Sequence, residues 1–368
     1  MFDPTAVPTI DPNPLPAPYW VFKLLLIVTF FLHITAMNCM LGGAGLALFA
    51  RWRGRTSAYG SRIFLDIAKK VPTLLAATIT LGIAPLLFVQ VLYGQYIYTS
   101  SIVMAWPWFL VILLLMFAYY GFYFVAHKGE KKPAAAGKVM LFSIALCLII
   151  GFIYSNNFTL SQTPATWAQK YLANPTGWNL NLAEPTLIPR YLHFMVSAVA
   201  VGGLLLVMVA WANWKRDEEY AKAIFHLGGK AFLYATMAQY LVGSWFLMSL
   251  PREMRLLFMG DNPLATALFG FGFLGAGVAI MLMSRAVRTA NIRLAGITVT
   301  GLTAAIILSM SVMRETLRDA YLKPWHHPQE MAVSTQWSPM IGFLVLFVAG
   351  IVLWFIMLMR YGFFKRAA

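Results

Sequence analysis

The chain has 368 residues, of which 60% are hydrophobic and only 11% carry a charge. A soluble domain is roughly half apolar and about a quarter charged, so this composition excludes an ordinary water-soluble protein. The net charge of +15 does not indicate a nucleic-acid partner. The basic residues gather in loops between apolar blocks, where membrane topology and contact with anionic lipid head groups account for them.

Apolar blocks long enough to cross a bilayer, which takes roughly 20 helical residues, recur along the whole chain. Lipid leaves no water to satisfy backbone amides, so helices are the expected element and the predicted fold class is all-α. In chain order, the nine predicted transmembrane helices are Trp20–Ala50, Val71–Tyr93, Ile102–His127, Val139–Tyr154, Thr186–Trp214, Ala231–Leu250, Pro263–Ser284, Leu294–Met313 and Met340–Arg360.

The loops between nine spans fall into two sets on opposite sides of the membrane. One set, together with the C-terminal tail, holds 20 of the 28 basic residues, from Arg51 to Arg366. The positive-inside rule then predicts a multi-pass protein of the bacterial inner membrane, with a periplasmic N-terminus and a cytoplasmic C-terminus. The first 19 residues lack a basic region and a cleavage site, so we do not expect a removed signal peptide.

An internal repeat with an offset of 160 residues organises the chain. Leu32-His33 precedes Gly42-Gly43 as Leu192-His193 precedes Gly202-Gly203, with nine residues from each histidine to the first glycine. Each unit holds four helices, so both copies share one orientation. The predicted organisation is a periplasmic tail (1–19), a first four-helix bundle (20–155), an outer loop (156–186), a second four-helix bundle (187–313), an outer loop (314–339), and a ninth helix with a cytoplasmic tail (340–368).

His33 and His193 are the candidate cofactor ligands. A histidine inside a membrane helix is rare and marks a functional site by default. The alternative is an interhelical hydrogen bond, typically worth about 0.6 kcal/mol. Two histidines at equivalent points of a duplicated bundle favour iron ligation, since imidazole binds haem and bundle cores hold haems. The glycine pairs permit close approach of either a flat macrocycle or a neighbouring helix.

The remaining cysteines, histidines and carboxylates narrow the chemistry. No Cys-x-x-Cys-His motif occurs and both cysteines fall in predicted spans, which excludes a covalently attached c-type haem and favours haem b. His127 and His226 are expected to be solvated, whereas the pair His326-His327 is either a metal site or exposed loop. All 13 carboxylates fall outside the predicted spans, and proton relays need them at membrane depth, so driven proton transport is disfavoured.

The chain resembles subunit I of the cytochrome bd quinol oxidases over most of its length. The stretch from Leu32-His33 to Gly43 is similar to the family's first helix, whose histidine binds the oxygen-site haem. The stretch from Tyr191 to Gly203 resembles the fifth helix, whose histidine binds the low-spin b haem. Two loops are also similar, namely Asn156-Asn157 through Gln162-Thr163-Pro164 and Tyr220-Ala221-Lys222. The resemblance implies haem on His33 and His193, with quinol as electron donor.

Several functional residues of that family are replaced. The glutamate near the outer end of helix 2 appears as Gln90, and the acidic residues of helix 3 have no counterpart between Trp106 and Tyr123. The arginine signature is reduced to Met313-Arg314-Glu315-Thr316-Leu317, and the glutamate that follows it in the family falls near Tyr321. The methionine ligand on helix 7 is not evident between Leu264 and Gly277, which leaves Met248 or Met254 to complete the low-spin haem. The quinol loop shrinks to Pro251-Arg252-Glu253-Met254-Arg255.

These observations predict a haem b-containing membrane electron-transfer subunit that exchanges electrons between a quinone or quinol and a partner redox protein. Oxygen reduction of the bd type is not expected, because the carboxylates that deliver protons to the haem are missing. The candidate cofactor-binding residues are His33, His193, Gln90, Met248 and Arg314, with His33 and His193 binding haem iron. Arg252, Glu253 and Arg255 either line a quinone head-group site or anchor their loop among lipid head groups.

Two alternatives stay open at this point. One is a terminal quinol oxidase with altered ligands, and the other is a haem-free anchor or scaffold subunit of a respiratory complex. If the chain is an enzyme subunit, we expect a quinol-oxidising or quinone-reducing oxidoreductase. The expected partners are the lipid bilayer, an additional membrane subunit, and a periplasmic c-type cytochrome or similar protein that docks on the outer segments Asn156–Pro189 and Arg314–Pro339.

Overall fold

The computed structural model describes residues 13–54 and 59–357, and every regular element in this part of the chain is a helix. The long helices are α1 (Tyr19–Arg53), α3 (Val71–Val103), α4 (Ala105–Lys128), α5 (Pro133–Ser161), α7 (Leu187–Asn213), α8 (Glu218–Ser249), α10 (Pro263–Arg288), α11 (Thr300–Leu322) and α12 (Trp337–Met357). Three short helices are α2 (Gly60–Ala68), α6 (Trp167–Ala173) and α9 (Arg252–Leu256).

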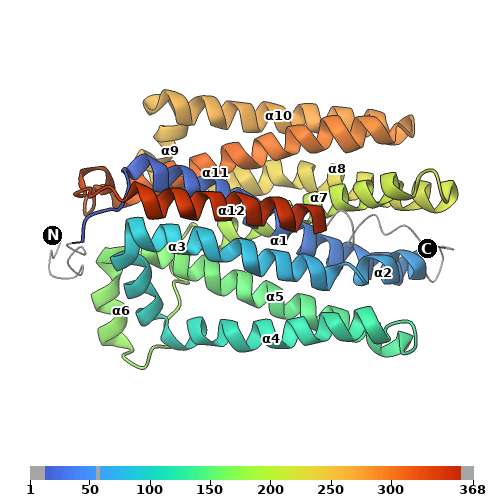
Figure 1. Ribbon diagram of the computed structural model, residues 1–368, viewed down its shortest axis with the longest axis horizontal. Helices are drawn as coiled ribbons and strands as arrows, with labels where there is room; N and C mark the ends of the chain where they lie inside the picture. The colour runs from blue at the N-terminus through green and yellow to red at the C-terminus, as the bar shows by residue number, and fades with distance from the viewer. Residues whose placement is uncertain (1–12, 55–58, 358–368) are drawn as a thin grey trace.

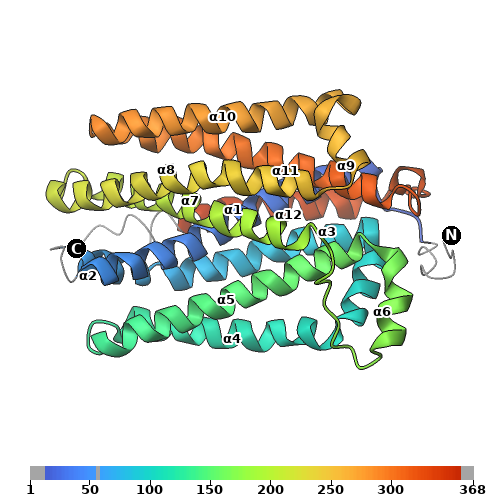
Figure 2. The ribbon, with the colours of Figure 1, turned by 180° about the vertical axis from the view of Figure 1, so that it is seen from behind.

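The long helices run roughly side by side along the long axis of the molecule (Figure 1). Helices α10 and α11 lie along one side and α4 and α5 along the other, with α1, α3, α7 and α8 between them (Figures 1 and 2). We use "outer end" for the end that carries α6 and α9, and "inner end" for the end that carries α2 and the α4–α5 turn. The names follow the sequence-based topology, and the side of the membrane remains a prediction.

Local sequence signals explain where several helices begin. Asp217 caps α8, accepting a hydrogen bond from the Tyr220 amide at 3.1 Å, and Asn262 caps α10 in the same way. Pro133 and Pro263 occupy first-turn positions, where a missing amide hydrogen costs nothing. These signals account for the start of α8 after Asp217 and of α10 after Asn262.

Eight helical segments in the described part of the chain are long and apolar enough to cross a membrane, which is the architecture of a polytopic membrane protein. They match eight of the nine predicted spans. Helix α8 contains the predicted span Ala231–Leu250 but is not among the eight, so the count of nine is not confirmed. The end of the last predicted span, at Arg360, lies outside the described residues.

Three helices extend at least seven residues farther toward the outer end than predicted. Helix α3 continues to Val103, ten residues beyond the predicted end at Tyr93. Helix α5 continues to Ser161, which makes Asn156 and Asn157 helical and buried rather than part of a loop. Helix α11 continues to Leu322, nine residues beyond the predicted end at Met313. The extension of α11 places charged residues inside a candidate membrane span.

The boundaries of two of the four helix pairs follow the 160-residue offset. Shifted by 160, α4 (105–128) becomes 265–288, and α10 is Pro263–Arg288. Shifted likewise, α5 (133–161) becomes 293–321, and the second copy is the span Leu294–Leu322. The arrangement as two separate four-helix bundles remains an expectation.

The first glycine of each predicted pair serves helix packing. A Cβ built on Gly42 would lie 1.7 Å from the carbonyl oxygen of Ala198, and one built on Gly202 would lie 2.4 Å from the carbonyl carbon of Gly42. Of the two roles that the sequence left open, close approach of a neighbouring helix is therefore the one these glycines have. Helices α1 and α7 cross at this point, inside the main apolar core.

Candidate cofactor site

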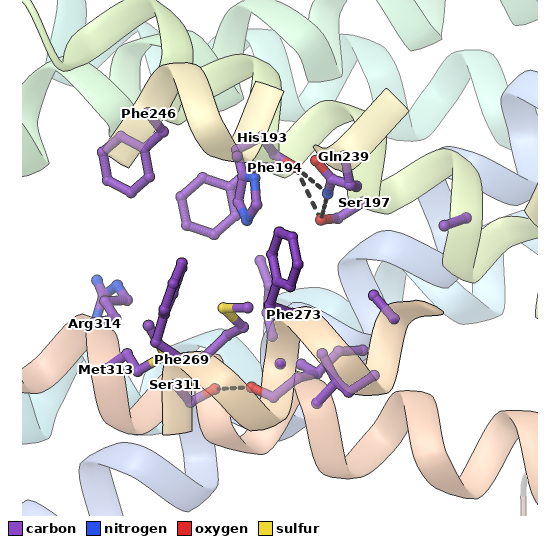
Figure 3. A pocket seen from close by; sticks show the side chains of 18 of the residues that line it. His193, Phe194, Ser197, Gln239, Phe246, Phe269, Phe273, Ser311, Met313 and Arg314 are labelled. Atoms are coloured by element: carbon purple, nitrogen blue, oxygen red, sulfur yellow. Dashed lines mark hydrogen bonds between the residues drawn. The ribbon is translucent and has the colours of Figure 1, made fainter. Parts of the chain in front are cut away.

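A cavity of about 290 Å³ lies in the second half of the chain, between α1, α5, α7, α8, α10 and α11. Its walls are mostly aromatic and aliphatic side chains, including Phe194, Phe246, Phe269 and Phe273 (Figure 3). Small-molecule and cofactor sites are typically apolar cavities of about 300–1,000 Å³ with a few polar groups that fix the ligand. This cavity is at the lower end of that range.

His193 is the polar group at the middle of the wall formed by α7. Its imidazole is directed into the cavity (Figure 3), and its buried Nδ1 has no hydrogen-bond partner in the described part of the chain. The Cε1 and Nδ1 edge lies against Gly243 of α8, where a Cβ would be 3.4–3.5 Å from the ring. A structural histidine of a helix interface would be hydrogen-bonded. The absence of any such bond among described groups indicates a site for a ligand.

His33 has a comparable setting in the first half. Its Nδ1 lies 3.0 Å from the carbonyl oxygen of Thr78, and because a carbonyl only accepts, Nδ1 carries the proton and Nε2 keeps a free lone pair. Metal-binding histidines usually donate their second ring N–H in this way. The ring packs on Gly82 of α3 as His193 packs on Gly243. His33 is not among the residues that line the cavity at His193.

Two arginines line the cavity, of which Arg190 is buried and Arg314 is partly buried. Arg190 donates to Gln162 Oε1 at 3.1 Å, and its Nε has no partner among the described residues. Arg314 lies over the rings of Phe30 and Phe158, 4.0 and 4.2 Å from their centroids. Arg190 is also close to Phe158, at 4.8 Å, and makes no ion pair within the described part of the chain. The cavity therefore has an excess of positive charge at this wall, which suits an anionic group on a ligand.

The far part of the cavity wall is polar without charge. Gln239 donates from Nε2 to the carbonyl oxygen of His193 at 2.9 Å and to Ser197. Its Oε1, Asn38 Oδ1 and Thr236 Oγ1 are buried without a hydrogen-bond partner among described groups, and all three residues line the cavity. These groups can bind water or a polar edge of a ligand.

The other predicted cofactor residues are scattered. Met248 is 64% exposed and does not line the cavity, although it was expected near the haem iron. Gln90 lies on α3, eight residues beyond Gly82 and so about 12 Å farther along the helix axis. Arg314 is the member of the predicted set that lines the cavity together with His193.

Met310 and Met313 were not anticipated. Both belong to α11 and line the same cavity as His193, which is on α7. The Met310 methyl group lies at Gly272 of the cavity wall, whereas Met313 packs on the outer cluster of Leu250, Phe258, Ala265 and Leu317. Met310 lies four residues before Arg314, so it shares a helix face with a predicted residue, and that spacing was the available signal.

The expectation that no carboxylate lies in a membrane span is wrong. Glu315 belongs to the candidate span Leu294–Leu322 and its side chain is only 1% exposed. Arg314 and Arg318 each donate to it at 2.6 Å, and Lys23 Nζ is 3.3 Å away. Its charge is tolerated because three cations surround it. The arguments that rested on this absence, against proton transfer and against oxygen reduction, lose that support.

The predicted quinone residues lie on or beside the short helix α9. Arg252 and Glu253 are exposed, and Arg255 donates to the carbonyl oxygen of Met248 at 3.4 Å. None of the three lines the cavity. Both roles that the sequence left open for them, head-group site and loop anchor, are compatible with this position.

The histidine pair of the last outer loop is divided. His326 is buried and its Nε2 donates to the carbonyl oxygen of Leu92 at 2.7 Å, while His327 is exposed. The ring of His326 packs on Tyr93 and Tyr96. Within the described residues, no group of three or more His, Cys, Asp or Glu side chains is placed to hold a metal ion. The pair is therefore not simply exposed loop.

The fold is that of an all-helical polytopic membrane protein, with a mostly apolar cavity among its helices. No protein-family model matches the chain, and no curated protein matches its sequence. Among solved structures, it is similar to the bd oxidase from Geobacillus thermodenitrificans, with a TM-score of 0.75 and 13% sequence identity. The similarity covers 95% of this chain and 99% of the other. At that identity it shows the fold alone.

Proposed function

We propose that this chain is a haem b-containing membrane electron-transfer subunit that exchanges electrons between a quinone or quinol and a partner redox protein. The observation that carries the proposal is the His193 cavity, where the imidazole faces a mostly apolar space and its buried Nδ1 has no hydrogen-bond partner among the described groups. The bd oxidase fold supports a role in membrane redox chemistry. When bound, haem supplies one-electron chemistry at its iron.

The donor groups of the cavity fit haem. His193 on α7 would bind the iron from one side, and the Met310 thioether on α11 is our proposed sixth ligand in place of Met248. Histidine–methionine pairs are known haem ligation in cytochromes. Arg190 and Arg314 would bind the two propionate carboxylates, which accounts for two arginines at one cavity wall. The apolar side chains exclude water from the macrocycle.

His33 is the proposed ligand of a second haem. Its Nδ1–H bond to the Thr78 carbonyl fixes the ring and leaves Nε2 for iron. Gly82 leaves room for the imidazole beside α3. Gln90 is too far along α3 to act at the same iron, and we propose no ligand role for it.

Quinone exchange is proposed at the outer end, near Arg252, Glu253 and Arg255. The partner redox protein and an additional membrane subunit remain proposals, as does the orientation with the N-terminus in the periplasm. The topology proposal is supported by the position of basic residues such as Arg51, Lys128 and Arg285 at the inner end.

A bd-type terminal quinol oxidase is the second candidate. It is favoured by Glu315, a buried carboxylate next to the cavity of the kind that the sequence was thought to lack. Oxygen uptake with quinol by the purified protein separates the two functions. Uptake that is lost in the His33→Ala variant favours the oxidase, whereas intact haem spectra without uptake favour the electron-transfer subunit.

The test of the proposed function is a pigment analysis of the purified protein. We expect haem b in the pyridine haemochrome assay and a reduced-minus-oxidised spectrum with separable contributions lost in His193→Ala and His33→Ala. His127→Ala is the matched control, because His127 is exposed at the end of α4 and donates locally to Tyr123. A folded but colourless protein overturns the proposal and favours the haem-free scaffold. Met310→Leu should retain haem but change it from low to high spin.

A further inference from the structure

A chain of ionic contacts leads from the cavity toward the outer surface. Arg314, which lines the cavity, donates to Glu315 Oε1 at 2.6 Å. Glu315 Oε2 is 3.3 Å from Lys23 Nζ, and Lys23 Nζ is 2.8 Å from Asp319 Oδ2. Tyr93 of α3 closes the network, since its hydroxyl donates to Asp319 and accepts from Lys23. We call these five residues the outer network.

The outer network connects helices that are far apart in sequence. Lys23 belongs to α1 and Tyr93 to α3, while the remaining members are on α11. Lys23 and Glu315 are 292 residues apart. A purely structural ion pair needs two partners, but this network continues across five side chains from the cavity wall to a partly exposed carboxylate.

The two carboxylates of the outer network differ in their surroundings. Glu315 is 1% exposed and contacts Lys23, Arg314 and Arg318, so it is held as a carboxylate. The Asp319 side chain is 29% exposed and lies three residues before the outer end of α11 at Leu322.

The charged and titratable groups facing Asp319 come from four elements. They are Lys23 and Tyr19 on α1, Tyr93 on α3, Glu315 and Arg318 on α11, and His326 of the following loop. Only Lys23 makes an ion pair with Asp319 within the described part of the chain. Of the two carboxylates, Asp319 is therefore the one that is partly exposed and paired with a single cation.

We propose that the outer network is a redox-linked proton site. When quinol gives one electron to a haem bound in the cavity, leaving a semiquinone and releasing one proton to water, the added negative charge would favour binding of one proton from outer water to the Asp319 carboxylate. When the electron leaves to the partner, the carboxylic acid releases the proton to the same water. One electron and one proton thus enter and leave together, and Glu315, Lys23 and Arg314 transmit the charge without titrating. The inference rests on the proposed function.

The test is a redox titration of the purified protein at several pH values, followed by the haem spectrum. Because reduction binds a proton, the midpoint potential of the haem at His193 should fall as pH rises. Asp319→Asn should lose most of this pH dependence while retaining haem. Glu330→Gln is the matched control, because this exposed carboxylate of the loop that follows α11 lies outside the network and should leave the slope unchanged.

The outcomes separate the two proposals. If the protein binds no haem, the proposed function fails first. If it binds haem and the potential is independent of pH, or the slope survives in Asp319→Asn, the proton site is overturned and the proposed function stands. Should Asp319→Asn fail to fold, Tyr93→Phe removes one hydroxyl from the same carboxylate and should shift the pH interval of the slope. An unshifted interval in Tyr93→Phe likewise contradicts the inference.

Discussion

Gly42 and Gly202 occupy equivalent positions in the two halves of the chain and face each other where α1 crosses α7. A Cβ on Gly42 would lie 3.0 Å from the Cα atom of Gly202, and one on Gly202 would lie 2.7 Å from the Cα atom of Gly42. Reciprocal contact between equivalent residues is what an axis of pseudo-symmetry produces. Small residues at such crossings let membrane helices approach closely and gain packing contacts.

Alanine at either glycine should therefore destabilise the fold. We expect Gly42→Ala and Gly202→Ala each to cost about 1–3 kcal/mol, the range for overpacking, because backbone atoms rather than flexible side chains block the added methyl group. Thermal unfolding of the detergent-purified protein measures the effect. Gly45→Ala is the control, since a Cβ there meets nothing within 4 Å and α1 gains helix propensity. Equal stability of all three variants would contradict the packing role.

The buried carboxylate Glu315 should be far more important for stability than an exposed one. Replacing Glu315 with Gln leaves Lys23, Arg314 and Arg318 without their shared anion, and breaking a buried ion pair costs about 3–5 kcal/mol. Glu130→Gln provides the comparison, because its pair with Lys69 is exposed at 3.7 Å and worth at most about 1 kcal/mol. Unfolding of both variants in detergent gives the difference. Similar losses in the two variants would mean that the network is not the stabilising unit.

The sequence predicted the features of the fold that depend on local composition. Apolar runs predicted eight helices that are long and apolar enough to cross a membrane, whereas the equivalence of His33 with His193 remains a prediction. The sequence failed at the outer end of α11, because the charges of Arg314, Glu315 and Asp319 ended the apolar run. Those charges are neutralised within the helix and by Lys23, a residue 292 positions away that no local pattern reveals.

The candidate site was predicted only in part, because some of its residues are recognisable from tertiary contacts alone. His193 stood out because a histidine is rare in a span. Arg190, three residues earlier on the same face, was read only as one of the basic residues outside the cytoplasmic set, since its pairing with Gln162 and Phe158 is tertiary. Met310 carries no distinguishing pattern in a chain with 20 methionines, and only the cavity singles it out.

Replacing the glycine beside each histidine with alanine should affect the two proposed haem sites unequally. A Cβ on Gly82 would lie 2.8 Å from the Cε1 and Nδ1 atoms of His33, whereas one on Gly243 would lie at ordinary contact distance from His193. We expect Gly82→Ala to displace the His33 ring, break its bond to the Thr78 carbonyl and lower haem content, with Gly243→Ala close to the parent protein. The haem-to-protein ratio measures both. A loss confined to Gly243→Ala would contradict the assignment of the two rings.

The loop that follows α11 should loosen on acidification because of His326. Burial lowers the pKa of His326 below its ordinary value of about 6.5, and the neighbouring His327 acts in the same direction, while the bond to the Leu92 carbonyl and the charge of Asp319 oppose it. The unfolded loop therefore binds a proton more readily than the docked loop. Stability from this contact is present above the unfolded pKa and is lost as pH falls below about 6.5 toward the lower folded value.

Limited proteolysis of residues 323–336 at a series of pH values measures this docking. We expect cleavage of the parent protein to accelerate on acidification below about pH 6.5, the ordinary histidine pKa. His326→Gln should be cleaved faster at neutral pH, because it loses the ring contacts with Tyr93 and Tyr96, and should show little further change with acid. His327→Gln is the matched control, since His327 is exposed, and it should keep the acid response of the parent protein. An acid response that persists in His326→Gln but disappears in His327→Gln would contradict this prediction. It would mean that His327, rather than His326, controls the acid response of the loop. The contact between the rings of His326 and Tyr93 would then not depend on the protonation state of His326.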